Sequence, residues 1–144
     1  MVILVINGPN MNMLGKRDKK HYGDMTYQEL VSRMKSWGVE RGIDIEVFQS
    51  NHEGEIVDRI QKMDYEGLVI NPGAFTHYSY SIRDALEIVQ VPKVEVHISN
   101  IYAREGFRKE SVIAPVCDGQ ISGLGFLSYI LALEYVLYKL HENF

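Results

Sequence analysis

Side chains that could bind and protonate a small molecule occur in three loops, each of which follows a short apolar run. The loops are NGPNMN at 7–12, NPGAFTH at 71–77 and HISN at 97–100. Amides, imidazoles and hydroxyls suit recognition of a polyhydroxylated or carbonyl compound through hydrogen bonds. A single Asn after a strand often only closes a turn, but three such loops together favour a binding site. The candidates are Asn10, Asn71, His77, His97 and Ser99.

His97 is the candidate general acid, because an imidazole changes charge near neutral pH. Glu95 lies two residues earlier in an apolar run with the character of a strand, so both side chains point to the same face. A carboxylate behind an imidazole orients the ring and selects its tautomer. The alternative is a structural histidine at a strand end, bonded to a backbone carbonyl.

Residues 14–25 form a charged, glycine-containing loop between the first apolar run and the next amphipathic segment. This connection is longer than most between a strand and a helix, and long loops of this kind are often lids. Its best chemical candidates are Tyr22 and Arg17, since a nearby guanidinium stabilises the phenolate that a tyrosine base requires. A charged, solvated loop is the alternative.

Two arginines, Arg104 and Arg108, follow His97 in the next loop. A guanidinium can hold a carboxylate through two parallel hydrogen bonds. Surface pairing with Glu105 or Glu110 is the alternative for either arginine. No local cluster of metal ligands surrounds the histidines, and neither a GxGxxG sequence nor a P-loop occurs. The sequence therefore predicts neither a metal nor a cofactor.

Apolar periodicity and capping signals predict strands and helices that alternate along the chain. Thr26 with Glu29, and Ser50 with Glu53, have the spacing of a capping box before an amphipathic segment. The expected strands are residues 2–6, 43–48, 67–70, 93–98 and, more weakly, 112–116, and the expected helices include 26–41, 79–89 and about 123–140.

Such alternation predicts an α/β fold, with residues 1–144 as a single catalytic domain. Five strands favour a flavodoxin-like, doubly wound parallel sheet in the order 2-1-3-4-5. In that order the first and third strands flank the switch point of the sheet, and ligands bind there at the carboxyl ends of the strands. The three polar loops should therefore meet in space.

Composition narrows the class of protein further. Hydrophobic residues make up 46% and charged residues 24% of the chain, which favours a globular domain over disorder. A net charge of −4 argues against nucleic-acid binding. The lone cysteine favours a reducing compartment, and the first residues lack the features of a signal peptide. The apolar stretch at 121–140 contains polar residues and favours a buried helix over a membrane span. We therefore expect a cytoplasmic protein.

The last helix is apolar around most of its circumference. Leu124, Leu127, Leu131 and Tyr135 cannot share a face with Leu133 and its apolar neighbours, although a helix outside a sheet needs only one buried stripe. We favour a subunit contact over a deep core position for this helix.

Taken together, these motifs resemble those of the type II 3-dehydroquinate dehydratases of the shikimate and quinate pathways. The resemblance runs almost end to end, and ordered motifs of this length are far more specific than any single one. They are NGPN at 7–10, GKR at 15–17, YG at 22–23, QSNHEG at 49–54, NPGAFTH at 71–77, EVHISN at 95–100 and REGFR at 104–108.

The resemblance implies a lyase that dehydrates 3-dehydroquinate to 3-dehydroshikimate by anti elimination through an enolate, without a cofactor. It implies a flavodoxin-like subunit in a homo-oligomer, a dodecamer built as a tetramer of trimers. Tyr22 is implied as the base at C2, stabilised by Arg17, and His97 as the acid, oriented by Glu95, while Asn10 helps to place the reactive groups. The implied substrate-binding residues are Asn71, His77, Ile98, Ser99, Arg108 and Asp84, the last reaching a neighbouring subunit's site.

The competing class is a non-catalytic, flavodoxin-like module that binds a small molecule. A flavin-binding member would carry a Ser/Thr-rich phosphate loop after the first strand, and a phospho-receiver would carry an acidic cluster there. This chain has NGPN at that position. The sequence thus favours the enzyme over the binding module.

Overall fold

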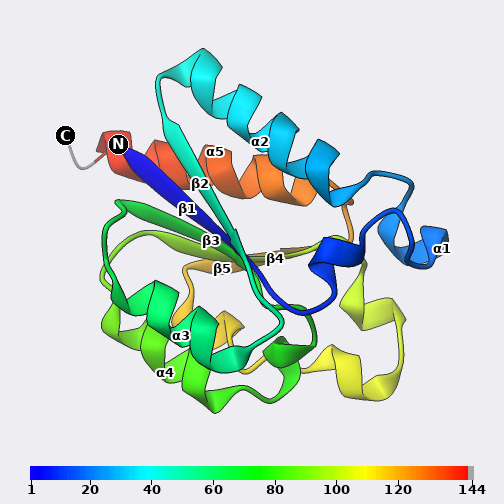
Figure 1. The fold of residues 1–144 in the computed structure, drawn as a ribbon. Helices are drawn as coiled ribbons and strands as arrows, with labels where there is room; N and C mark the ends of the chain where they lie inside the picture. The colour runs from blue at the N-terminus through cyan, green and yellow to red at the C-terminus, as the bar shows by residue number, and fades with distance from the viewer. Residues whose placement is uncertain (143–144) are drawn as a thin grey trace.

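The computed structural model describes residues 1–142, which form one parallel sheet with helices on both faces (Figure 1). The sheet order is β2-β1-β3-β4-β5, and every neighbouring pair is parallel. The predicted order 2-1-3-4-5 is therefore confirmed. The strands are β1 (Val2–Asn7), β2 (Asp44–Gln49), β3 (Gly67–Asn71), β4 (Lys93–His97) and β5 (Gly119–Ser122).

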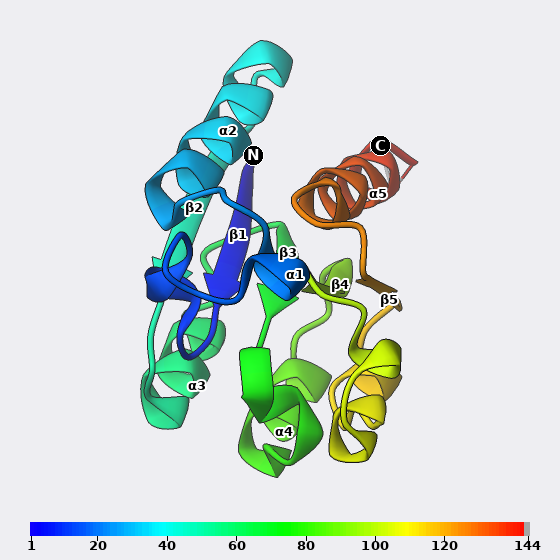
Figure 2. The ribbon, with the colours of Figure 1, turned by 90° about the vertical axis from the view of Figure 1, so that its right-hand side faces the viewer.

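Two pairs of helices cover the sheet, and a short helix lies at the carboxyl ends of the strands. Viewed along the sheet, α2 and α5 lie on one side and α3 and α4 on the other (Figure 2). Among residues 1–142, no helix is long and apolar enough to cross a membrane. The helices are α1 (Lys19–Tyr22), α2 (Tyr27–Arg41), α3 (Glu53–Gln61), α4 (Tyr80–Ile88) and α5 (Leu127–Glu142).

The central strand β1 is apolar at successive positions because both of its faces are covered. Ile3 and Val5 pack in the core beneath α2 and α5, whereas Leu4 and Ile6 pack in the core beneath α3 and α4. All four side chains are fully buried. Since successive side chains of a strand point to opposite faces, this one run contributes to both cores and holds the sheet between the helix layers.

Only one of the two expected capping boxes forms. Thr26 Oγ1 accepts the Glu29 backbone N–H at 3.1 Å and caps α2. The prediction for Ser50 is wrong, because α3 starts after His52. Ser50 Oγ accepts the His52 N–H at 2.9 Å and donates to Glu55 at 3.0 Å. A buried serine directly after a strand makes this local turn instead of capping a helix.

The strand expected at 112–116 is also wrong. Residues Ala114–Val116 form a 3₁₀ turn, and the fifth strand is β5, a few residues later. The apolar residues of this segment pack against the core beneath α3 and α4, where Ile113 is fully buried. Pro115 cannot donate to a sheet ladder. The apolar pattern was therefore caused by packing under the sheet and not by pairing within it.

The apolar circumference of α5 divides into two faces. Leu133 and Val136 are fully buried, whereas Leu127, Leu131 and Tyr135 are exposed. The helix begins at Leu127, later than the expected 123, because Gly123 precedes it with a φ of 90°. The exposed apolar face is where the subunit contact was expected, and that contact stays a prediction.

Gly8 brings the loops after β1 and β3 together, and Gly8→Ala is expected to destabilise the protein by about 1–3 kcal/mol. A Cβ at Gly8 would lie 2.4 Å from the Pro72 carbonyl oxygen, while a Cβ at Gly54 meets nothing within 4 Å. Gly54→Ala on α3 is therefore the control, with equal or slightly raised stability. Urea denaturation measures both. An unchanged free energy of unfolding for Gly8→Ala would contradict this close packing.

Candidate active site

The loops after β1, β3 and β4 meet in one cleft at the carboxyl edge of the sheet. Asn7 and Asn71 are register partners in neighbouring strands, and the Gly8 N–H donates to the Asn71 carbonyl at 2.7 Å. The loops therefore leave the sheet side by side. Most of the predicted site residues line the cleft: Asn10, Arg17, Tyr22, Asn71, His77, His97, Ile98, Ser99 and Arg108.

Tyr22 lies between two guanidinium groups. Its hydroxyl oxygen accepts hydrogen bonds from Arg17 Nη2 at 2.8 Å and from Arg104 Nη1 at 2.6 Å. The Arg17 guanidinium also lies 3.6 Å from the centre of the Tyr22 ring. Arginine stays charged and has only donors, so this arrangement stabilises an anionic oxygen over a neutral hydroxyl.

The same corner of the cleft concentrates positive charge. Burial lowers the pKa of Arg17, and the charges of Arg104 and Arg108 lower it further, although attraction to Tyr22 opposes them. Three guanidinium groups this close repel one another. An anion in the cleft, either a phenolate or a ligand carboxylate, would relieve that repulsion.

The two arginines of the loop after β4 differ in their partners. Arg108 donates from Nε to Glu105 at 2.5 Å, the surface pairing that was the alternative for this residue, yet it still lines the cleft. Arg104 instead contacts Tyr22 and donates to Ser99 Oγ at 3.3 Å. The contact between Arg104 and Tyr22 was not predicted from the sequence, because no local signal joins residues 82 positions apart.

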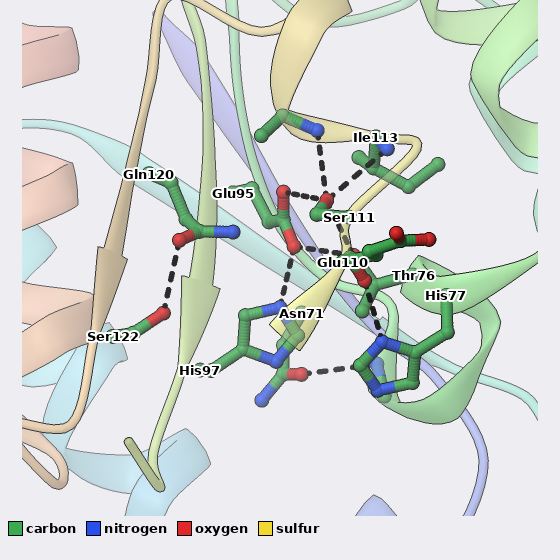
Figure 3. A network of polar contacts seen from close by, with 12 residues as sticks. Asn71, Thr76, His77, Glu95, His97, Glu110, Ser111, Ile113, Gln120 and Ser122 are labelled. Carbon is green, nitrogen blue, oxygen red and sulfur yellow. Dashed lines mark hydrogen bonds and ion pairs between the residues drawn. The ribbon is translucent and has the colours of Figure 1, made fainter. Parts of the chain in front are cut away.

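A hydrogen bond between the imidazole of His97 and the carboxylate of Glu95 orients the ring (Figure 3). His97 Nε2 lies 2.5 Å from Glu95 Oε2, so the histidine is bonded to a carboxylate and not to a backbone carbonyl. Glu95 is fully buried and His97 nearly so. Burial by itself raises the pKa of Glu95, but hydrogen bonds from His97, Thr76 and Ser111 and the charge of His97 outweigh it, and the pKa is lowered.

Because the pKa of Glu95 is lowered in the folded protein, its contribution to stability should depend on pH. Ionised Glu95 stabilises the fold above its unfolded pKa of about 4.3, and that stabilisation is lost as the pH falls through the lower folded value. The free-energy difference between wild type and Glu95→Gln should therefore shrink between pH 6 and pH 3.5, as measured by urea denaturation at about those two pH values. A difference independent of pH would refute it.

Asn71 is held largely by the protein itself. Its Nδ2 donates to the Tyr129 hydroxyl at 2.9 Å and its Oδ1 accepts the Gly73 N–H at 3.1 Å. The Tyr129 hydroxyl in turn donates to Asn7 Oδ1 at 2.6 Å. Tyr129, from α5, is fully buried and joins the two central strands. Nothing in the sequence distinguishes it from other buried residues of that helix.

The remaining predicted residues lie in different surroundings. His77 Nδ1 is 2.7 Å from the Glu110 carbonyl oxygen, so Nδ1 carries the proton and Nε2 is free to accept one. Asn10 adopts a left-handed conformation with a φ of 69°, which asparagine tolerates. Asp84 lies on the exposed surface of α4, and it does not line the cleft of its own chain.

The cleft as seen is nearly closed. It encloses about 90 Å³, far below the roughly 300–1,000 Å³ of most small-molecule sites. Arg17 and Tyr22 close it from the loop at 14–25, so that loop must move for a ligand to enter. Within residues 1–142, no group of three or more His, Cys, Asp or Glu side chains could hold a metal ion.

Comparison with known proteins agrees with this geometry. The family described as "Dehydroquinase class II" matches residues 1–137. The chain belongs to this family. The resemblance inferred from the motifs of this class II dehydroquinase is thereby confirmed.

Relatives of this dehydroquinase match over nearly their whole length. A 3-dehydroquinate dehydratase of Thermotoga maritima is 66% identical over 142 residues, 99% of each chain. The crystal structure of a type II dehydroquinase from Butyrivibrio crossotus has a TM-score of 0.93 and 52% identity, covering 94% of this chain and 97% of the other. That from Propionibacterium acnes has a TM-score of 0.89 and 45% identity, covering 93% and 94%.

Proposed function

We infer that this chain is a 3-dehydroquinate dehydratase, a lyase that converts 3-dehydroquinate to 3-dehydroshikimate and water. The observation that carries the inference is the pairing of two catalytic units in one cleft. One is a phenol whose oxygen is bonded to two guanidinium groups, and the other is an imidazole backed by a buried carboxylate. The first suits a base and the second suits an acid.

The reaction starts at the Tyr22 oxygen. As a phenolate stabilised by Arg17 and Arg104, it takes a proton from C2 of the substrate. The electrons of the broken C–H bond move toward the C3 carbonyl and form an enolate. Hydrogen bonds from the cleft stabilise the developing negative charge on that oxygen, and Asn10 helps to place the reacting groups.

Loss of the C1 hydroxyl completes the elimination. The enolate restores the C3 carbonyl, a double bond forms between C1 and C2, and His97 gives its proton to the departing oxygen, so that water leaves. An anti elimination needs acid and base on opposite faces of the substrate. Tyr22 is the last residue of α1 and His97 the last residue of β4, which suits approach from different directions.

Substrate binding falls to the polar groups around the acid and the base. We assign the carboxylate to the backbone N–H groups of Ile98 and Ser99, and assign Arg108 to binding as well. Asn71 has its oxygen and one N–H engaged within the protein, and its Nδ2 also lies 3.4 Å from the weak acceptor Met11 Sδ. We propose that a substrate hydroxyl replaces this weak contact to sulfur. His77 Nε2 is free to accept from another hydroxyl.

We also propose a cytoplasmic homo-oligomer, a dodecamer built as a tetramer of trimers, in which Asp84 reaches the site of a neighbouring subunit. Two surfaces support assembly: the exposed apolar face of α5 and the exposed Asp84, which lies outside its own cleft. Native sizing tests this, with a mass far above the 16.5 kDa of one chain as the expected result. A fully active monomer at micromolar concentration would refute both the assembly and the role of Asp84 in a neighbouring site.

A direct assay tests the activity. Addition of 3-dehydroquinate to the purified protein should produce the absorbance of a conjugated enone, with or without a metal chelator. Tyr22→Phe is the control for contaminating activity. A colourless protein that produces no enone would refute the inference, and a yellow protein with bound flavin would instead support the binding module.

A further inference from the structure

Three hydrogen-bond donors surround the buried carboxylate of Glu95 (Figure 3). Its Oε2 accepts from Thr76 Oγ1 and from His97 Nε2, and its Oε1 accepts from Ser111 Oγ at 2.7 Å. Thr76 and Glu95 are both fully buried, and Ser111 is half-buried. The reaction described above uses only His97 and Glu95, so the two hydroxyls have no role in it yet.

The hydrogen-bond donors around the Ser111 and Thr76 hydroxyls determine which acceptor each hydroxyl can use. Ser111 Oγ receives the backbone N–H groups of Ile113 at 3.2 Å and Ala114 at 2.9 Å. These two donors occupy both of its acceptor positions, so its own proton must point to Glu95 or to Thr76 Oγ1, which is 2.9 Å away. Thr76 then has no acceptor except Glu95.

Neither hydroxyl can therefore accept a hydrogen from Glu95, and His97 Nε2 is the one remaining group that could. The hydroxyl donors stabilise the ionised carboxylate, so the proton between Glu95 and His97 lies on Nε2, and His97 as the acid carries a second, transferable proton on Nδ1. The lowered pKa of the Glu95 carboxyl, in spite of its burial, agrees with this. The nearby Cys117 adds no charge, because burial and the charge of Glu95 raise its pKa to about 12.

The two hydroxyls also connect the segments that form the cleft. Thr76 belongs to the loop after β3, and its carbonyl oxygen accepts the Val112 N–H at 2.8 Å. Ser111 directly follows Glu110, whose carbonyl bonds His77. The Glu95 carboxylate thus holds three segments together, and a change at either hydroxyl acts on the orientation of His97.

We propose that Thr76 and Ser111 are positioning residues: their hydroxyls keep Glu95 ionised and aimed at His97 Nε2, so that Nδ1 is the nitrogen that delivers the proton. The proposal rests on the function inferred above, in which His97 is the acid. It adds that the acid is an assembly of four side chains, of which Thr76 and Ser111 touch no substrate.

Paired substitutions separate the hydroxyl of Thr76 from its shape. Thr76→Val keeps the branched shape and loses the hydroxyl, and it should lower kcat roughly 10- to 100-fold, the effect of one hydrogen bond to a charged group. KM should change much less, because the hydroxyl does not contact substrate. Thr76→Ser keeps the hydroxyl and should recover most of kcat. The opposite order, with Val active and Ser impaired, would mean that Thr76 acts by packing and would overturn the proposal.

Ser111→Ala gives a second test at a half-buried position, should Thr76→Val fail to fold. It should also lower kcat with little change in KM, whereas Ser32→Ala, at an exposed position of α2, should change neither. Equal kcat for Ser111→Ala and Ser32→Ala would overturn the role of Ser111.

A spectroscopic measurement tests the inference without any turnover. Nitrogen NMR of ¹⁵N-histidine-labelled wild type should show that the neutral His97 ring carries its proton on Nε2, with a mixture of tautomers in Ser111→Ala and Thr76→Val. A neutral ring in the wild type with its proton on Nδ1 and none on Nε2 would overturn the proposal. Because this result needs no substrate, it stands even if the enone assay fails, and the two failures can be told apart.

Discussion

Replacing Tyr22 with phenylalanine is expected to lower kcat at least ~100-fold, the lower end of what a general base contributes, while the fold persists. The substitution keeps the ring that packs against the Arg17 guanidinium at 3.6 Å. It removes the oxygen to which Arg17 and Arg104 donate at 2.8 and 2.6 Å. Substrate would still bind, so KM should change far less than kcat.

Steady-state kinetics of the enone product measure this effect, and circular dichroism checks the fold. Tyr138→Phe, at an exposed position of α5, is the matched control and should retain wild-type kcat. If Tyr22→Phe keeps activity within a few-fold of wild type, Tyr22 is not the base and another group in the cleft must remove the C2 proton.

Arg17→Ala is the second large effect, with a fall in kcat of roughly 10- to 100-fold, as expected for loss of a hydrogen bond from a charged donor. Without this cation the Tyr22 oxygen loses a charged hydrogen-bond donor, and the anionic base is less stable. The acidic limb of kcat/KM should therefore move to higher pH, since that limb reports the base of the free enzyme. KM should change less than kcat, because the substrate-binding groups remain.

Kinetic profiles from neutral to alkaline pH for the variants of Arg17 and Arg104 provide the measurement. Arg17→Lys should rescue poorly, since an ammonium on a flexible stem lacks the planar fork of the guanidinium. Arg104→Ala should act in the same direction, and the double variant should not be additive, because both groups bind the same oxygen. Full kcat and an unmoved acidic limb in Arg17→Ala would exclude this activation of Tyr22.

Strand order was predictable from local sequence patterns because each element carries its own signal. The continuous apolar run of β1 requires cover on both faces, and Thr26 marks the start of α2 by a bond to a residue three positions away. Alternation of strands and helices then leaves few topologies, since crossovers between parallel strands are right-handed. The position of the fifth strand was predicted wrongly because β5 is short, partly exposed and polar in part. The more apolar segment before it packs under the sheet instead.

The chemical identity of the site was also present in the sequence. Glu95 and His97 are two residues apart on one strand, and Arg17 and Tyr22 share one loop, so spacing alone placed each pair together. Ordered motifs along the chain were enough to predict the family. Such short-range relations depend only on the geometry of a strand or a loop, which the local sequence determines.

Contacts between distant segments were beyond the reach of the sequence and appear only in the folded chain. Arg104 meets Tyr22 across 82 positions, Tyr129 meets Asn7 across 122, and Ser111 meets Glu95 across 16 through an irregular loop. A hydroxyl or a guanidinium in a loop has many possible partners, and its sequence context does not select one. The packing of α5 and of the loops on the sheet makes that selection, because a buried polar group must find a hydrogen-bond partner where the fold places it.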